Sequence, residues 1–309
     1  MASERLCEIA TAIRARNPRL ARADGETLAA FDSLARLELV LAVEEAFAVE
    51  FADDELAGVT SLEQLDAILA RKQREPRAAA ATAKERAAHD DAAEPLTRAT
   101  DPIASPWHAP VRGVVPPLMR LGFRLRAMHA DRLPATGAFL LCANHRSHLD
   151  SVALLAATGP RRRDLVFPAA RDYFFSGRRL ARVAARCLPL VPLEREGRVG
   201  ALKRNLREIE ACAARGRVIV LFPEGTRAAG DELQPFKDGL AFFAARLHVP
   251  IVPCWIEGTQ RALPRGAYWP RPVRLRVAFG APLAAPTEKE DAFVERVRAA
   301  MLALREESR

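Results

Sequence analysis

The sequence predicts two domains, an all-α domain at the N-terminus followed by an α/β domain. The chain has 309 residues, which is enough for two domains of ordinary size. Residues 1–70 hold 6 basic and 14 acidic residues, a net charge of −8, whereas residues 71–309 hold 41 basic and 25 acidic residues, a net charge of +16. Apolar residues recur at helical spacing in the acidic part, and short β-type runs alternate with helical stretches in the basic part.

Three helices are predicted in the acidic part, residues 1–70. The third of them begins at a cap formed by Thr60 and Ser61. Helices with one apolar stripe bury it against one another, so we expect a small bundle. The apolar positions of the three helices are, in order, Leu6, Ile9 and Ile13; Leu34, Leu37, Val40, Leu41 and Phe47; and Leu62, Leu65 and Ile68.

A linker is predicted over residues 71–105. This segment is rich in alanine and charged residues, contains three prolines and has no sustained apolar face. As a flexible coil it would span roughly 30–35 Å. We therefore expect it to tether the two domains.

The basic part, residues 106–309, alternates predicted strands with helices. This order is typical of an α/β domain whose sheet is covered by helices. Active groups in such domains lie on the loops that follow strands. The predicted strands are residues 138–143, 165–167, 188–193, 217–222, 251–256 and 274–279.

The loop after the first of these strands reads Asn144-His145-Arg146-Ser147-His148-Leu149-Asp150. An aspartate in the first turn of the next helix can hold the His145 ring in one tautomer, so that the ring deprotonates an alcohol near neutral pH. One alternative is a capping box of Ser147 and Asp150. Another is metal binding through His145, His148 and Asp150, but no further ligand cluster accompanies them, so we predict no metal.

A second loop, Phe222-Pro223-Glu224-Gly225-Thr226-Arg227, also follows a predicted strand. Its proline and glycine shape a tight turn that exposes backbone N–H groups, and the Arg227 guanidinium matches phosphate or carboxylate. Lys237 and Arg195 add further cations nearby in the sequence. The alternative is a structural turn with a surface arginine.

The N-terminal part resembles an acyl carrier protein over about residues 3–70, through Asp32-Ser33-Leu34, Glu38-Leu39 and the acidic run from Glu44 to Glu55. The resemblance implies a four-helix-type bundle in which Ser33 carries covalent 4′-phosphopantetheine, attached by a phosphopantetheinyl transferase. It also implies an acidic second helix that docks basic enzymes. Ala30 departs from the glycine usual at that position, and the alternative is that Ser33 is a plain helix cap.

The basic part resembles glycerolipid acyltransferases of the 1-acylglycerol-3-phosphate (lysophosphatidate) family over about residues 110–285. Four blocks carry this resemblance, and one departs from the family pattern, since Glu194 stands where aspartate is more usual. The blocks are NHxSxxD at residues 144–150, VPLER at 191–195, FPEGTR at 222–227 and VPIVP at 249–253.

The second resemblance implies a role for each matched residue. His145 would be the general base and Asp150 its orienting partner. Arg195 and Arg227 would hold the anion of the acceptor, Glu224 would position an arginine or the acceptor hydroxyl, and Pro253 would lie on the acyl-donor side. The substrate-binding set is Arg195, Glu224, Gly225, Thr226, Arg227 and Lys237.

The expected activity is transfer of a fatty acyl group from a phosphopantetheine thioester, on a carrier or on coenzyme A, to a lysolipid hydroxyl. The foremost acceptor is 1-acylglycerol 3-phosphate. One alternative is another acceptor, such as a lyso-aminolipid or a glycolipid. Another is a carrier module that recruits partners of a lipid-synthesis assembly.

Composition also indicates the cellular compartment and the class of partner. Five scattered cysteines without a CxxC pair favour a reducing cytoplasm. No apolar run reaches roughly 18–20 residues and the N-terminus lacks the apolar core of a signal peptide, so we expect no membrane-spanning helix. With 6% aromatics and no zinc finger, nucleic acid is not an expected partner.

An acceptor with acyl chains lies in the membrane, so we expect peripheral association with the inner face of the cell membrane. Leu118, Leu121, Leu125 and Met128 predict a helix over residues 117–130. This helix either lies on anionic lipid or packs within the fold.

Overall fold

The computed structural model describes residues 4–16, 28, 31, 33–52, 54–56, 58–74, 105–170, 186–194, 199–227, 230, 232–237, 239–267, 269–286 and 290–308. The chain divides into two units. The first unit comprises residues 1–100 with 194–207, and the second comprises residues 101–193 with 208–309. Each unit is described by itself.

The three helices predicted in the first unit are found. They are α1 (Glu4–Arg16), α2 (Ser33–Phe47) and α3 (Leu62–Arg74). Their common core includes Leu6, Leu39 and Leu65, each at most 1% exposed. On α2, the predicted positions Val40 and Phe47 contribute to this core, whereas Leu34, Leu37 and Leu41 do not. Helix α3 runs four residues into the segment predicted as a linker. Residues 75–104 lie outside the described part of the chain.

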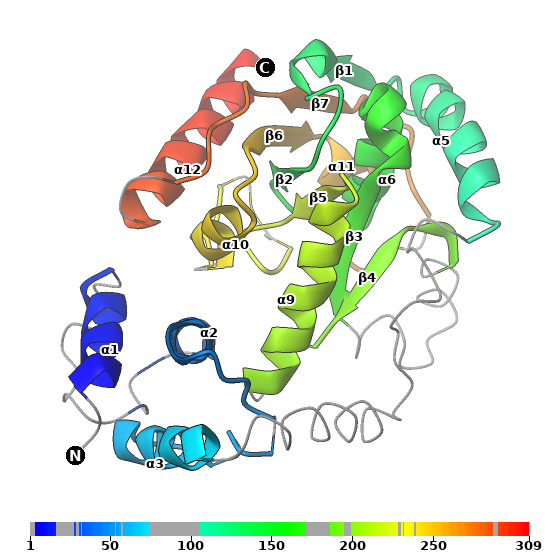
Figure 1. The fold of residues 1–309 in the computed structure, drawn as a ribbon. Coiled ribbons are helices and arrows are strands. Elements are labelled where there is room, and N and C mark those ends of the chain that lie inside the picture. The colour runs from blue at the N-terminus through cyan, green and yellow to red at the C-terminus, as the bar shows by residue number, and fades with distance from the viewer. Residues whose placement is uncertain are drawn as a thin grey trace. The chain divides into compact units, whose positions relative to one another are not determined.

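The second unit is built on a sheet with strand order β1-β7-β6-β2-β5-β3-β4 (Figure 1). Neighbouring strands are parallel except at β6 and β7, which pair antiparallel. The strands are β1 (Arg126–Met128), β2 (Phe139–Ala143), β3 (Leu165–Ala170), β4 (Leu190–Leu193), β5 (Val218–Leu221), β6 (Ile251–Glu257) and β7 (Arg276–Phe279). All six predicted strands are present with shifted ends, and β1 is an addition.

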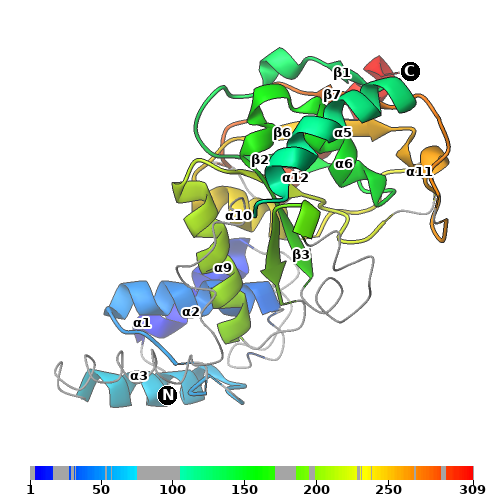
Figure 2. The same cartoon turned by 90° about the vertical axis from the view of Figure 1, so that its right-hand side faces the viewer.

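Helices cover both faces of this sheet (Figure 2). Side chains of β2 alternate between two cores, with Leu141 on one face and Leu140 on the other. The first face is covered by α5 (His108–Gly122), α6 (Leu149–Ala157) and α11 (Thr259–Ala262), and the second by the end of α9 (Val199–Ala214), α10 (Gly239–Leu247) and α12 (Glu290–Glu307). Two short 3₁₀ helices, η2 (Ala130–Arg132) and η3 (Gly159–Arg163), complete the elements that the structure describes.

The helix predicted over residues 117–130 is wrong in its bounds. Helix α5 begins at His108 and ends at Gly122. The amides of Phe123 and Leu125 both donate to the Met119 carbonyl, and Arg124 adopts a left-handed φ of 47° that no α-helix continues. The chain then enters β1, because pairing with β7 satisfies its backbone groups.

The topology determines where the site forms. Strand β2 lies between β5 and β6 and is parallel to both. Because parallel strands end at the same edge, the loops after β2, β5 and β6 meet there. The two motif loops are those after β2 and β5.

Candidate active site

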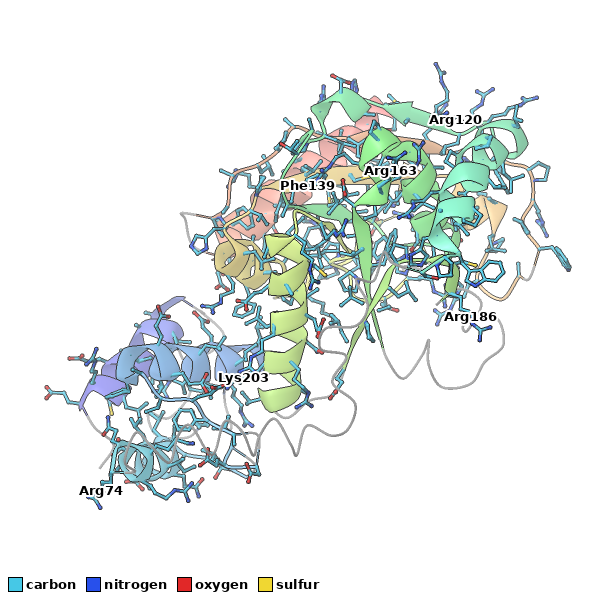
Figure 3. The ribbon with its side chains drawn as sticks, turned by 45° about the vertical axis from the view of Figure 1, so that its right-hand side comes forward. Arg74, Arg120, Phe139, Arg163, Arg186 and Lys203 are labelled. Atoms are coloured by element: carbon cyan, nitrogen blue, oxygen red, sulfur yellow. The ribbon has the colours of Figure 1, made fainter. Side chains whose placement is uncertain are left out.

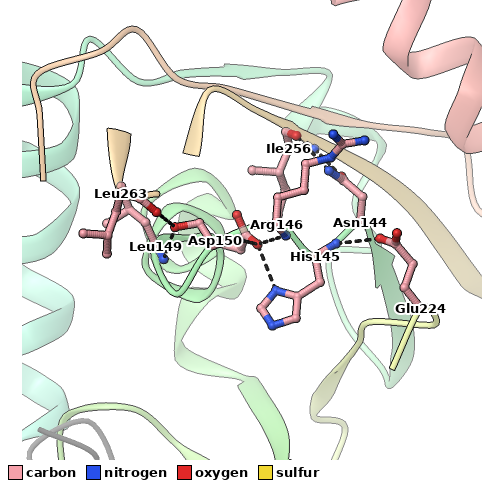
Figure 4. Close-up of polar contacts among 9 residues, drawn as sticks. Asn144, His145, Arg146, Leu149, Asp150, Glu224, Ile256 and Leu263 are labelled. Carbon is pink, nitrogen blue, oxygen red and sulfur yellow. Dashed lines mark hydrogen bonds and ion pairs between the residues drawn. The ribbon is translucent and has the colours of Figure 1, made fainter. Parts of the chain in front are cut away.

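One carboxylate oxygen organises the loop between β2 and α6 (Figure 4). Asp150 is fully buried, and its Oδ2 accepts hydrogen bonds from the amides of Arg146 at 2.7 Å and Ser147 at 2.8 Å. The Nδ1 atom of His145 lies 2.9 Å from the same oxygen. Since a carboxylate only accepts, Nδ1 carries a proton, and in the neutral ring Nε2 then keeps its lone pair. The arrangement leaves Nε2 able to take a proton from a bound group.

Only one half of the capping-box alternative forms, and it does not exclude the base role. Asp150 accepts the Ser147 amide, but the Ser147 hydroxyl oxygen accepts the Leu149 amide at 3.2 Å, and the Asp150 amide donates instead to the Ser147 carbonyl at 3.2 Å. The Ser147 hydroxyl also donates to the Leu263 carbonyl at 2.8 Å. The helix N-terminus and the histidine therefore share one aspartate.

Glu224 ties the second motif loop to the first. Its side chain is buried, with the residue only 2% exposed. Oε1 accepts the His145 amide at 2.9 Å, and Oε2 accepts the Gln234 amide at 3.0 Å. These bonds use both carboxylate oxygens on backbone donors. Glu224 is thus a positioning residue for the histidine backbone.

The imidazole of His145 rests on an aromatic ring. Its centroid lies 4.2 Å from that of Phe222, with the two planes 21° apart. The His145 side chain keeps 21% of its surface exposed. The ring is therefore held by Asp150 at one edge and by Phe222 on one face, and it remains accessible.

Asn144 fixes the other side of the loop. Its amide nitrogen donates to the Ile256 carbonyl at 2.9 Å, and its oxygen accepts the Ile256 amide at 2.7 Å. Asn144 is completely buried. The loop is thus joined to the end of β6 by two hydrogen bonds made by one side chain.

Positive charge gathers beside the histidine. Partial burial lowers the pKa of His148, and the nearby charges of Arg227 and His145 lower it further, while Asp150 opposes them. Arg227 is therefore close enough to act on this loop. Gly225 has a φ of +68°, and the stem of Lys237 packs directly against it.

Two buried thiols lie beneath the site without contributing to it. Burial raises the pKa of Cys142, and the negative charge of Glu224 raises it further. Burial also raises the pKa of Cys254. Both therefore remain protonated, so neither thiol serves as a base.

The structure thus brings together His145, Asp150 and Glu224, and it places Gly225 and Lys237 side by side. Thr226 is exposed next to them. Pro253 lies within β6 and is buried. Arg195 lies outside the described residues, and Ser33 belongs to the first unit, where it begins α2.

Sequence reasoning missed three contributions. Each of them joins residues from separate elements. They are the stacking of Phe222 on His145, the hydrogen bonds of Asn144 to Ile256, and the hydrogen bond from the Gln234 amide to Glu224. Phe222 and Asn144 lie inside the motif blocks, which was the signal that could have found them.

The bonds of Glu224 predict a loss of stability on substitution. Glu224→Gln keeps the shape but places an amide N–H₂ against a backbone donor, so one buried donor loses its partner. We expect the free energy of unfolding to fall by about 1–3 kcal/mol. Urea denaturation measures it, with Glu232→Gln, an exposed site in the following segment, as the control. Equal stability of the two variants would contradict the positioning role.

Known proteins match the part of the chain that carries these loops. A family model described as Acyltransferase matches residues 124–257. The 1-acyl-sn-glycerol-3-phosphate acyltransferase of Limnanthes alba is 30% identical over 93 residues, which cover 30% of this chain and 33% of that protein. A putative 1-acyl-sn-glycerol-3-phosphate acyltransferase of Caenorhabditis elegans is 28% identical over 134 residues, 43% of this chain and 49% of that protein.

Among solved structures, the 1-acyl-sn-glycerophosphate acyltransferase PlsC from Thermotoga maritima aligns with a TM-score of 0.49 at 21% identity, covering 64% of this chain and 81% of that one. The chain spans between about a third and a half of the length of the two relatives above. All four motif blocks lie inside the family match. The match to the family model therefore supports an acyltransferase domain over residues 124–257.

Proposed function

We propose that the protein is an O-acyltransferase that moves a fatty acyl group from a phosphopantetheine thioester to the hydroxyl of a lysophospholipid, foremost 1-acylglycerol 3-phosphate. The observation that carries the proposal is the His145–Asp150 pair at 2.9 Å with Nε2 left open, inside a matched acyltransferase domain. The names of the two relatives described above support the choice of acceptor.

The chemistry follows from the open nitrogen. Nε2 of His145 takes the proton of the acceptor hydroxyl while that oxygen attacks the thioester carbonyl carbon. The imidazolium that forms is stabilised by the Asp150 carboxylate against Nδ1–H. As the tetrahedral intermediate collapses, the carbon–sulfur bond breaks and the thiolate takes the proton from Nε2. The base is thereby restored.

The acceptor's phosphate would lie among the cations of the second loop. Arg227 acts electrostatically on the histidine loop, and Lys237 lies against Gly225. We assign both to the anion, together with Arg195. The turn at Gly225 and Thr226 leaves both residues exposed, which suits a binding loop.

Loss of the base tests the mechanism. We expect His145→Ala to lower acyl transfer by at least about 10²-fold to 10⁴-fold, since general base catalysis is removed. The assay uses acylated carrier protein and a panel of lysophosphatidate, a lyso-aminolipid and a glycolipid, with products read by lipid mass spectrometry. His248→Asn is the control, because His248 is exposed and asparagine tolerates its φ of 52°.

The panel also identifies the acceptor. Product from lysophosphatidate that is lost in His145→Ala supports the whole proposal. Product from another acceptor supports the mechanism but identifies a different lipid as the substrate. Full activity of His145→Ala would contradict the role of this histidine.

We further propose that the first unit is a four-helix-type acyl carrier whose Ser33 bears 4′-phosphopantetheine. Ser33 is the first residue of a helix of 15 residues and lies two residues after the buried Phe31. A helix N-terminus favours the negative charge of a phosphodiester. When attached, the group supplies the thiol that holds the acyl chain, and α2 presents the acidic residues Glu38 and Glu45 for partner enzymes.

Modification of Ser33 is directly measurable. After co-expression with a phosphopantetheinyl transferase, we expect intact mass spectrometry to show one added phosphopantetheine, absent in Ser33→Ala. Ser61→Ala is the matched control, since it precedes helix α3 in the same unit. An unmodified wild-type chain would overturn the carrier role and leave only recruitment of partners.

We also propose peripheral association with the inner face of the cell membrane through helix α5. Trp107, Val114, Leu118 and Leu121 are 59%, 61%, 57% and 83% exposed. Their spacing places them on one face of the helix. Arg120 is exposed at the end of α5 (Figure 3), and Arg124 follows, so the apolar face is accompanied by cations that suit anionic lipid. Among the helices described, none has an apolar stretch long enough to cross a bilayer.

Charge placed on the apolar face tests this surface. We expect Leu118→Glu with Leu121→Glu to lower binding to anionic phospholipid vesicles at least about ten-fold, because two carboxylates must then enter the interface. The fold should persist, since both side chains are exposed. Ala299→Glu with Ala303→Glu adds the same charge to exposed positions of α12, on the other face of the sheet. Vesicle sedimentation compares them, and equal loss in both would contradict the assignment.

A further inference from the structure

Residues 233–237 contact both the second motif loop and helix α12, all within the second unit. The segment belongs to no helix or strand, so its backbone groups need partners outside regular structure. Pro235 restricts Gln234, which precedes it, to extended backbone. Leu233 anchors the segment, since it is 4% exposed and lies in the core on the α12 face of the sheet. Polar groups on two sides then fix the backbone.

Arg298 of α12 holds the segment from one side. Its Nη2 donates to the Leu233 carbonyl at 3.1 Å, and its Nη1 donates to the Gln234 carbonyl at 3.1 Å. The guanidinium carbon also lies 5.9 Å from the centre of the Phe236 ring. The side chain is half-buried. One planar fork of donors therefore contacts three residues of the segment.

The second motif loop holds the segment from the other side. The Gln234 amide donates to Glu224 Oε2 at 3.0 Å. The Lys237 amide donates to the Pro223 carbonyl at 2.8 Å. Oε1 of Glu224 in turn accepts the His145 amide at 2.9 Å (Figure 4). Helix α12 is thus linked to the catalytic loop through this segment and one carboxylate.

A single peptide group connects Arg298 to Glu224. The Leu233 carbonyl and the Gln234 amide belong to the same planar unit, so one cannot shift without the other. The carbonyl accepts from the guanidinium, and the amide donates to the carboxylate. A hydrogen bond at the carbonyl polarises the amide of the same unit and strengthens the bond that it donates. Arg298 therefore acts on the position of the Glu224 carboxylate and on the strength with which it is held.

We propose that Arg298 is a positioning residue for the general base. Its guanidinium fixes the peptide group between Leu233 and Gln234, this group fixes Glu224, and Glu224 fixes the His145 amide. The inference rests on the proposed function, which assigns the base to His145. Placement of a reacting group acts on kcat, whereas the KM of the acyl donor reports a different contact.

Steady-state kinetics with acylated carrier protein and lysophosphatidate tests this role. We expect Arg298→Gln to lower kcat about ten-fold at an unchanged KM for the acyl donor, since one hydrogen bond from a charged donor is worth roughly this factor. Arg298→Lys keeps the charge but loses the fork, so its kcat should lie between the two. An unchanged kcat in Arg298→Gln would overturn the proposal.

The control for these kinetics is Arg215→Gln. It removes the same charge at an exposed position between α9 and β5, at the edge of the sheet opposite to the motif loops. We expect it to keep the kcat of the wild type. A loss equal to that of Arg298→Gln would show an effect of net charge and not of position.

A double-mutant cycle separates positioning from a loss of stability. Arg298 and Glu224 act through the same peptide group, so Arg298→Gln should lower kcat by a smaller factor in Glu224→Gln than in the wild type. Each variant is assayed at a temperature where urea denaturation shows it to be folded. Equal factors in both backgrounds would overturn the proposed link.

Amide hydrogen exchange tests the same link without catalysis. Mass spectrometry on the full chain should show exchange at least about three-fold faster in Arg298→Gln for peptides that hold the Gln234 and His145 amides, because opening then breaks fewer hydrogen bonds. Peptides from α5 should keep their rates. Unchanged exchange, or a rise at Gln234 alone, overturns the proposal even if Glu224→Gln fails to fold. Inactivity of the wild type with every acceptor would instead overturn the proposed function and leave the exchange result valid.

Discussion

The buried carboxylate of Asp150 is the interaction on which the site depends. A carboxylate withdrawn from water is costly unless donors replace its hydration. Oδ2 meets this need with the amides of Arg146 and Ser147 and the ring of His145. Two of these donors belong to the backbone, so the charge determines the course of the loop and the loop in turn stabilises the charge. The imidazole is oriented as part of the same balance.

The sheet topology brings further loops into contact with the catalytic loop. Because β2 runs parallel between β5 and β6, three loops reach one edge. Glu224 links the loop after β5 to the His145 amide, and Asn144 links the same loop to Ile256 at the end of β6. The catalytic segment is therefore restrained from both neighbouring strands as well as by its own helix.

Local patterns could be predicted, and relations between distant segments could not. The strands and the pairing of His145 with Asp150 follow from apolar runs and from a spacing of five residues. Glu224 was assigned to an arginine or to the acceptor, yet it binds backbone amides 79 and 10 residues away, and an amide has no signature in the sequence. The helix at residues 117–130 failed because its apolar spacing also fits a shorter helix followed by β1, which forms only through pairing with β7.

The absence of a side chain at Gly225 affects where the neighbouring Lys237 side chain can lie. Asparagine also tolerates the left-handed backbone found there, so conformation alone does not demand glycine. A Cβ atom, however, would lie 3.1 Å from Cγ and 3.3 Å from Cε of Lys237. Glycine therefore leaves the space that the Lys237 side chain occupies beside the turn. The position of this cation depends on the absence of a Cβ atom at residue 225.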